Sequence, residues 1–144
     1  MKIVCLCDYA ASPPVMAPMK ELEKYGAEVV MMEDKGIQTI DDLFNAMFKM
    51  EQEGADSYPA YPPLLDAVKD ADVLVVHISS VNTEVLNAAT KLKYVAVLRG
   101  GIENVQEAIC KEKGIKIINA PSRSAHAVAD FTVGMMIAEM KNIA

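Results

Sequence analysis

Long apolar runs and cysteine pairs are both missing from this sequence of 144 residues. No stretch has the roughly 18–20 consecutive apolar residues that cross a bilayer. The apolar run at 3–7 is too short for a signal peptide and is soon followed by Asp8. Cysteine occurs three times, and an odd number argues against a disulfide framework. We therefore expect a cytoplasmic protein.

Basic residues are also in the minority. The net charge is -6 and the pI is about 4.9, and such an acidic surface repels phosphate backbones and anionic lipid heads. We therefore expect neither a nucleic-acid partner nor a membrane partner. The remaining composition, 52% hydrophobic and 24% charged, is that of an ordinary globular protein. The length corresponds to one domain, covering residues 1–144.

Three kinds of ligand motif are absent. No expected strand is followed by G-x-G-x-x-G, so the chain is not itself a dinucleotide-binding unit. The segment 8–14 contains no glycine, which argues against an FMN-binding flavodoxin, and Asp8 alone does not supply the acid pair of a phospho-receiver. Cys5 and Cys7 could form a metal pair, but no Cys/His cluster completes the ligands, which favours buried structural thiols and no metal site.

Five apolar runs alternate with helical patterns along the chain. Each run is continuous, which is typical of strands buried on both faces of a parallel sheet. The expected strands cover 2–7, 28–32, 72–77, 94–98 and 116–118, and the expected helices cover 18–25, 40–53, 64–69, 83–88, 104–113 and 124–142. This order predicts an α/β fold, a doubly wound parallel sheet of about five strands with helices on both faces.

The helix expected at 124–142 has almost no polar face. A terminal helix of this composition should be covered by other protein. It either packs on this domain's own sheet, or it packs against a second domain or a partner subunit. The sequence leaves both readings open.

Polar residues gather where the expected strands end, which is the edge at which parallel sheets bind ligands. Both arginines of the sequence lie here, Arg99 after the fourth strand and Arg123 after the fifth. Arginine pairs well with carboxylate or phosphate, and Gly100-Gly101 lets the backbone present N–H groups to an anion. Asn104 is expected to begin a helix whose positive end adds to this anion pocket. The alternative is a tight turn that happens to carry one arginine.

The remaining polar candidates each have a structural alternative. Ser79 and Ser80 are either ligand hydroxyls or an ordinary loop. His77 and His126 could act as general bases, but neither has an evident carboxylate partner in the sequence, and a lone histidine at a strand end is usually structural.

From Asp70 onward a series of short segments follows a recognisable order: ADVLVV at 71–76, VNTEVL at 81–86, LK at 92–93, GIENV at 101–105, KGI at 113–115, NAP at 119–121 and AVADFTVG at 127–134. In this order and spacing they resemble the D-isomer-specific 2-hydroxyacid dehydrogenases, the group that includes D-3-phosphoglycerate dehydrogenase. The resemblance covers about half of the chain. Before Asp70 only the alternation of strands and helices agrees.

The resemblance implies a flavodoxin-like substrate-binding domain and a small 2-hydroxy or 2-oxo acid as ligand. It implies substrate contacts at Ser79, Ser80, Arg99, Gly100 and Gly101. In the family an NAD-binding Rossmann-type domain, inserted after the last helix of this chain, carries the catalytic Arg, Glu and His. We therefore assign no catalytic or cofactor-binding residue here, and expect NAD only in the intact enzyme. The last helix runs between the domains in this family and helps to form a homodimer.

This chain departs from the family pattern at four positions. Arg99 replaces the first glycine of the usual Gly-x-Gly, and Glu103 stands for the usual Asp. Asp130 stands for Glu, and Ser124 stands where Asn is common. The change at Arg99 alters the loop expected to hold the substrate, so the identity of the acid is not fixed by the resemblance.

Two hypotheses about function follow. In the first, the chain is the substrate-binding half of an NAD-dependent D-2-hydroxyacid dehydrogenase and is inactive alone. In the second, it is a stand-alone small-acid binding or regulatory module without catalysis. A stand-alone domain should cover its last helix, whereas a half of a larger enzyme should leave it exposed or dimerise through it.

Overall fold

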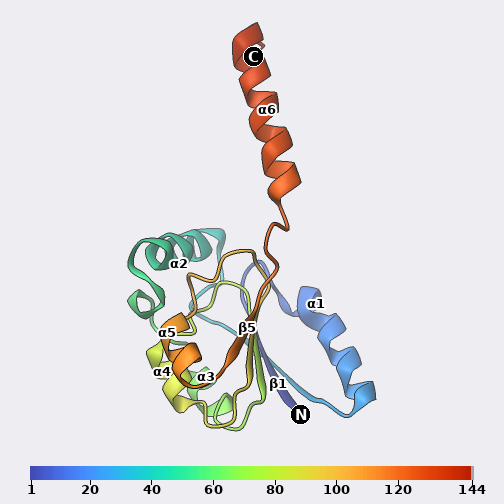
Figure 1. Ribbon diagram of the computed structural model, residues 1–144. Helices are drawn as coiled ribbons and strands as arrows, with labels where there is room; N and C mark the ends of the chain where they lie inside the picture. Colours follow the sequence, from blue (N-terminus) through green and yellow to red (C-terminus); the bar gives the residue numbers. More distant parts are fainter. Residues whose placement is uncertain (144) are drawn as a thin grey trace.

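The computed structural model describes residues 1–143, and its centre is a five-stranded sheet in the order β2-β1-β3-β4-β5 (Figure 1). The strands are β1 (Lys2–Cys7), β2 (Glu28–Glu33), β3 (Val73–Val76), β4 (Tyr94–Val97) and β5 (Lys116–Ile118). All four pairings are parallel. The predicted doubly wound α/β sheet is therefore confirmed, and its strands match the expected ranges to within one residue at each end.

The apolar runs are buried as their composition predicts. β1 lies inside the sheet, between β2 and β3, and its residues from Ile3 to Cys7 are buried. β5 lies at an edge, where Ile118 remains 54% exposed. Cys5, Cys7 and Cys110 are buried free thiols, which confirms the structural reading of the cysteines. Burial raises the pKa of the Cys5 thiol to about 11, so this group is neutral and unreactive at physiological pH.

Helices cover both faces of the sheet. On one face, α3 (Pro62–Ala67), α4 (Thr83–Ala88) and α5 (Glu107–Glu112) lie side by side over the larger apolar core (Figure 1). On the other face, α1 (Pro13–Met16) continues into a 3-10 helix, η1 (Ala17–Tyr25). This segment contributes Met16 to a smaller core with Ile3 and Val75. The helix expected at 18–25 therefore begins earlier and is mostly wound as a 3-10 helix.

The helix α2 (Ile40–Glu53) lies beyond the carboxyl ends of the strands and is followed by a 3-10 turn, η2 (Ala55–Ser57) (Figure 1). A capping box at Thr39 and Asp42 begins the helix, as each side chain accepts the other residue's backbone N–H at 3.1 and 3.0 Å. Its apolar side packs on Ile78 of the loop after β3. α2 therefore covers part of the edge formed by the carboxyl ends of the strands, where ligands were expected to bind.

The predicted helix start at Asn104 was wrong. α5 begins only at Glu107, because the segment before it pairs with the loop after β3. The N–H of Val81 donates to the carbonyl of Asn104, and the N–H of Gln106 donates to the carbonyl of Val81. The six-residue helix therefore adds no helix N-terminus to the glycine loop.

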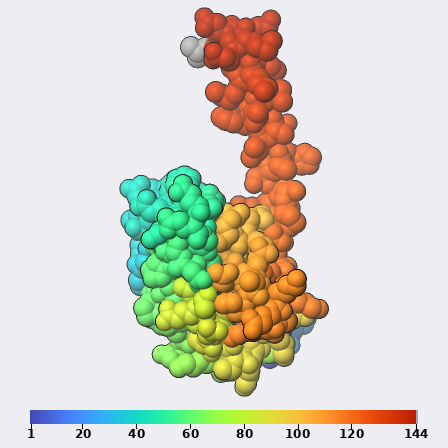
Figure 2. Space-filling view, turned by 60° about the vertical axis from the view of Figure 1, so that its left-hand side comes forward, coloured from blue at the N-terminus to red at the C-terminus, as the bar shows by residue number. Residues whose placement is uncertain are grey.

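The last helix, α6 (Ala125–Lys141), projects away from the rest of the molecule (Figures 1 and 2). None of its side chains is buried, and Phe131 and Met140 are 69% and 81% exposed. The turn before it contains Ser122 with a φ of 61°, in the left-handed region that favours glycine. The reading in which this helix packs on the domain's own sheet is therefore wrong. No helix within residues 1–143 is long and apolar enough to cross a membrane.

Candidate functional site

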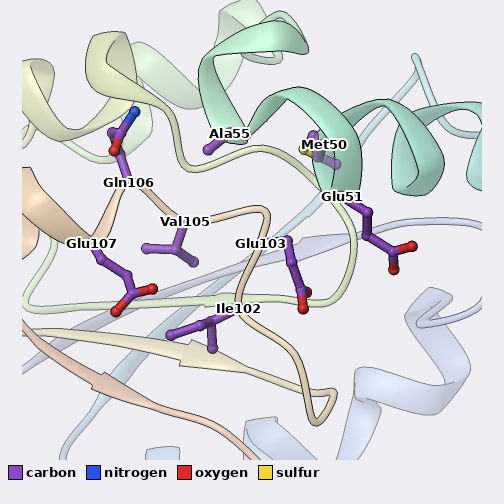
Figure 3. A pocket seen from close by; sticks show the side chains of 9 residues that line it. Met50, Glu51, Ala55, Ile102, Glu103, Val105, Gln106 and Glu107 are labelled. Carbon is purple, nitrogen blue, oxygen red and sulfur yellow. The ribbon is translucent and has the colours of Figure 1, made fainter.

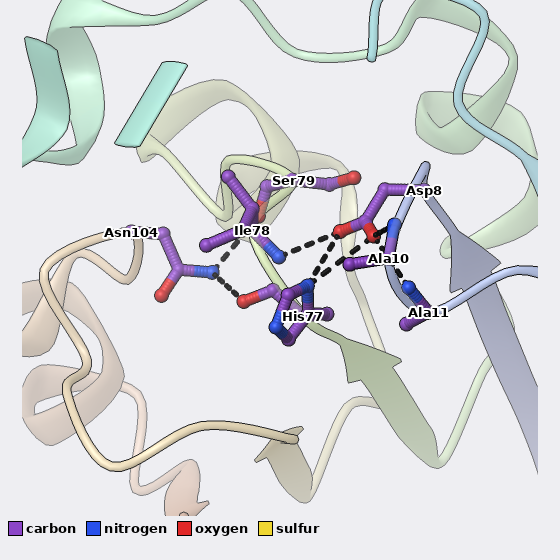
Figure 4. Close-up of polar contacts among 7 residues, drawn as sticks. All are labelled: Asp8, Ala10, Ala11, His77, Ile78, Ser79 and Asn104. Atoms are coloured by element: carbon purple, nitrogen blue, oxygen red, sulfur yellow. Dashed lines mark hydrogen bonds and ion pairs between the residues drawn. The ribbon is translucent and has the colours of Figure 1, made fainter. Parts of the chain in front are cut away.

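A buried carboxylate joins the loops that follow β1 and β3 (Figure 4). Asp8 accepts backbone N–H groups from Ala10 at 3.0 Å and Ala11 at 2.8 Å, and from Ile78 at 2.8 Å. Nδ1 of His77 lies 3.2 Å from both carboxylate oxygens. His77 therefore has a carboxylate partner, which sequence reasoning missed because the two residues are 69 positions apart. The available signal was that both follow strands that pair with each other.

The charge state of Asp8 fixes the orientation of the His77 ring. Burial alone would raise the pKa of Asp8, but the imidazole and the N–H groups of Ala11 and Ile78 outweigh it and lower the pKa below its usual range. Since an ionised carboxylate only accepts, Nδ1 of His77 carries a proton and donates it. The ring is thereby held by one nitrogen, and Nε2 is left for other contacts, with the side chain 15% exposed.

The hydroxyls of Ser79 and Ser80 point into the protein. Ser80 Oγ donates to the carbonyl of Ala55 at 2.8 Å, and the buried Ser79 hydroxyl faces Asp34 without a close partner in the described part of the chain. The amide of Asn104 donates to the carbonyl of Ser79 at 3.0 Å (Figure 4). Of the two readings, these contacts favour an ordinary loop over ligand hydroxyls, although substrate contact at this loop stays a prediction.

Arg99 is bound to carboxylates of the protein itself. Its guanidinium nitrogen Nη2 lies 3.0 Å from Glu51 Oε1 and 3.0 Å from Glu103 Oε2. Figure 3 shows both glutamates beside a hollow of about 280 Å³ that Glu107 also lines. Three carboxylates there make this side of the edge unfavourable for an acid. The two glutamates offset the charge of Arg99, which makes it a weak partner for the carboxylate of an acid.

The glycine loop has free backbone donors, and the carboxylate of Glu103 lies against its Gly101 end. The N–H groups of Gly100 and Gly101 make no hydrogen bond with another residue of the described chain. The loop is held from below, because Asn119 Nδ2 donates to the carbonyl of Gly100 at 2.6 Å. A Cβ atom at Gly100 would lie 3.4 Å from the carbonyl oxygen of Ala120, so the backbone is packed closely there. Fixed, unpaired N–H groups of this kind can receive an anion.

A second hollow, of about 380 Å³, opens on the α1 side of the same edge. Its lining consists of Ala10, Ala11, Val15, His77, Leu98 and Arg123. The fold thus brings Arg123 to the same cavity as His77, next to the turn that holds Gly100. His126 does not join them, because it is an exposed residue of α6. Within residues 1–143, no group of three or more His, Cys, Asp or Glu side chains could hold a metal ion.

A family model for the catalytic domain of D-isomer specific 2-hydroxyacid dehydrogenases matches residues 27–141. The chain belongs to this family. The family assignment made from the segments after Asp70 is confirmed, and the match also includes the residues between 27 and Asp70, where only the alternation of elements had agreed.

Curated relatives agree with this dehydrogenase assignment. The chain is 42% identical over 81 residues to D-3-phosphoglycerate dehydrogenase of Methanocaldococcus jannaschii, which covers 56% of this chain and 16% of the relative. It is 34% identical over 99 residues to hydroxypyruvate reductase of Thermotoga maritima, covering 68% of this chain and 32% of the relative. The chain therefore spans a third or less of these relatives.

Solved structures show the same fold. The NAD+-bound 3-phosphoglycerate dehydrogenase of Entamoeba histolytica superposes with a TM-score of 0.63 at 26% identity, over 96% of this chain and 38% of that one. A Pyrococcus horikoshii protein gives a TM-score of 0.66 at 23% identity, over 99% of this chain and 34% of that one. The expected flavodoxin-like α/β class is thus confirmed for this dehydrogenase domain.

The opposite surroundings of two buried aspartates generate a stability test. Asp8→Asn should lower the free energy of unfolding at neutral pH by on the order of 2 kcal/mol, since it removes a buried, hydrogen-bonded charge. Because the folded-state pKa of Asp8 is lowered, its contribution is present above the unfolded pKa and is lost as the pH falls through the folded pKa. Urea unfolding over this range should show the difference shrinking.

Asp34→Asn is the matched control. Burial raises the pKa of Asp34, so its ionised form is disfavoured in the folded state. This substitution should leave stability at neutral pH unchanged or raise it. Equal losses for the two variants would contradict the assignment of Asp8 as the stabilising carboxylate.

Proposed function

We propose that this chain is the substrate-binding half of an NAD-dependent D-2-hydroxyacid dehydrogenase, and that it binds the carboxylate of a small 2-hydroxy or 2-oxo acid. The observation that carries the proposal is the pair of free N–H groups at Gly100 and Gly101 beside the hollow lined by His77 and Arg123. Membership of the dehydrogenase family supports it. So do the names of the relatives, D-3-phosphoglycerate dehydrogenase and hydroxypyruvate reductase.

In this proposal the backbone, and not Arg99, receives the substrate carboxylate. The N–H groups of Gly100 and Gly101 donate to it, and Arg99 with its two glutamates stiffens the loop. The loop of Ser79 and Ser80 borders the acid without offering its hydroxyls. The rest of the substrate extends into the neighbouring hollow of about 380 Å³, toward Nε2 of His77 and the guanidinium of Arg123. Two side chains that can carry positive charge favour an acid with a polar or anionic distal end.

NAD(H) and the catalytic groups belong, in this proposal, to a Rossmann-type domain outside residues 1–144. A nicotinamide cofactor supplies or accepts the hydride, and this chain orients the acid for the transfer. The turn after β1 does not fit a dinucleotide, because Asp8 already takes the N–H groups of Ala10 and Ala11 that a pyrophosphate would need. We therefore expect no NAD to bind residues 1–144 alone.

The alternative, a stand-alone module that binds a small acid without catalysis, is less well supported. That hypothesis predicted a covered last helix, whereas the side chains of α6 are exposed along its length. A location in the cytoplasm stays a prediction from composition.

The first test is NADH oxidation with a panel of 2-oxo acids, comparing the 144-residue chain with the product of its complete reading frame. We expect turnover only in the longer protein, because positioning a substrate without a hydride donor accomplishes nothing. Turnover by the 144 residues alone would refute the proposal, whereas a reading frame that adds no further domain, together with no activity, would move the assignment to the binding module.

Gly100→Ala tests the place of the carboxylate. A methyl group at this position has ordinary contact with Ala120, so the fold should tolerate it, but it restricts the backbone angles with which the loop presents its N–H groups. In the complete enzyme we expect KM for the acid to rise about tenfold or more, corresponding to ~1.4 kcal/mol or more, with a smaller change in kcat. Glu112→Ala, at an exposed position of α5 that does not line these hollows, is the control and should leave KM unchanged. An unchanged KM for Gly100→Ala would place the carboxylate elsewhere.

We further propose that α6 forms a homodimer contact. Val128, Phe131 and Met135 lie on one side of the helix at spacings of three and four, and they are 60%, 69% and 55% exposed. The double variant Phe131→Ser/Met135→Ser should shift the protein from dimer to monomer in light scattering, while Glu139→Gln should not. A wild-type protein that is monomeric at tens of micromolar would refute the dimer.

A further inference from the structure

A third hollow, of about 370 Å³, lies apart from the glycine loop. The β2–α2 connection and the segment between η2 and α3 form its walls. Its lining consists of Asp34, Gly36, Tyr58, Pro59, Ala60, Tyr61 and Pro62. Two tyrosines and two prolines make the lining mostly apolar, and Asp34 is the one acid among the lining residues. This combination is typical of small-molecule sites, in which a few polar groups fix the ligand in an apolar cavity.

Asp34 is a buried carboxylate with few donors. Only 5% of the residue is exposed, and its Oδ1 accepts one backbone N–H, from Gly36 at 2.9 Å. The hydroxyl of Ser79 faces it as well, but burial and the nearby negative charge of Asp8 outweigh both and raise its pKa. Asp8, equally buried, receives three backbone N–H groups and an imidazole. Within residues 1–143, Asp34 is therefore the buried acid that still lacks donors for its charge.

The negative charge also reaches the aromatic wall. Burial raises the pKa of the Tyr58 hydroxyl, and the charges of Asp34 and Asp42 raise it further. The nearest lysine in sequence, Lys35, is bound to Glu33, which offsets its charge, and it does not line the hollow. Electron-rich rings in a negative field attract cations and repel anions.

We propose that this hollow binds the ammonium group of a small organic amine. The ammonium lies against the rings of Tyr58 and Tyr61, and its N–H groups donate to the Asp34 carboxylate. The apolar stem of the amine contacts the prolines. A cavity of this volume takes a ligand of few non-hydrogen atoms. The site is chemically opposite to the glycine loop, which receives an anion, and it does not depend on the dehydrogenase assignment.

The test is a titration of the 15N-labelled 144-residue chain with propylammonium chloride, followed by NMR. We expect saturable shifts of the amide signals of Gly36 and Tyr58 with a millimolar dissociation constant, and a shift at Ser79, because its hydroxyl faces Asp34. The neutral probe 1-butanol, of similar size and shape, should bind at least about tenfold more weakly. Sodium chloride at the same concentration controls for ionic strength.

Three variants make the outcome decisive. Asp34→Asn keeps the side-chain shape and removes the charge, and Tyr58→Leu removes an aromatic ring while keeping apolar bulk. Each should weaken propylammonium binding at least about tenfold. Asp41→Asn, which removes an exposed carboxylate that does not line the hollow, should leave binding unchanged. The proposal is overturned if 1-butanol binds as well as propylammonium, if neither variant weakens binding, or if the shifts map to the glutamate-lined hollow of Figure 3.

Discussion

The carboxylate of Asp8 is the constraint on which the ligand edge depends. Its charge is tolerated in a buried position because backbone N–H groups and an imidazole surround it. Those donors come from the loops after β1 and β3, and binding them fixes both loops. The position of His77 follows directly. The position of Asn104 depends on Asp8 indirectly, because its side-chain amide donates to two backbone carbonyls of the loop after β3.

Most of the fold could be predicted from local pattern. Continuous apolar runs located all five strands, and α2 and α4 begin and end at the expected residues. The start of α5 was mispredicted because a polar residue before an apolar segment can be either a helix start or a buried contact. Asn104 is a buried contact, and this depends on its hydrogen bond to the neighbouring loop after β3, which the local sequence does not reveal. The exposure of α6 could not be predicted either, because an apolar helix in a sequence does not identify its covering surface.

The residues of the candidate site could be listed from the sequence, but their contacts could not be predicted. Reading the carboxyl ends of the strands identified the edge that carries Gly100, Gly101, Arg123 and His77. It could not assign partners, because Arg99 meets Glu51 across 48 residues and His77 meets Asp8 across 69. These pairings arise from the packing of α2 over the edge and from the order of the strands. The shortage of hydrogen-bond donors around Asp34 could not be predicted for the same reason, since burial and the number of donors are properties of the folded chain.

The turn between β5 and α6 contacts the glycine loop and also leads into α6. Asn119 and Ala120 bind the backbone of the glycine loop, and a few residues later the chain passes through the left-handed Ser122 into α6. A helix of 17 residues is a lever arm of about 25 Å. Because α6 starts from the segment that supports Gly100, a force applied at the far end of α6 acts on the backbone of the glycine loop. A movement of any domain or subunit bound to α6 would therefore also change the geometry of the glycine loop.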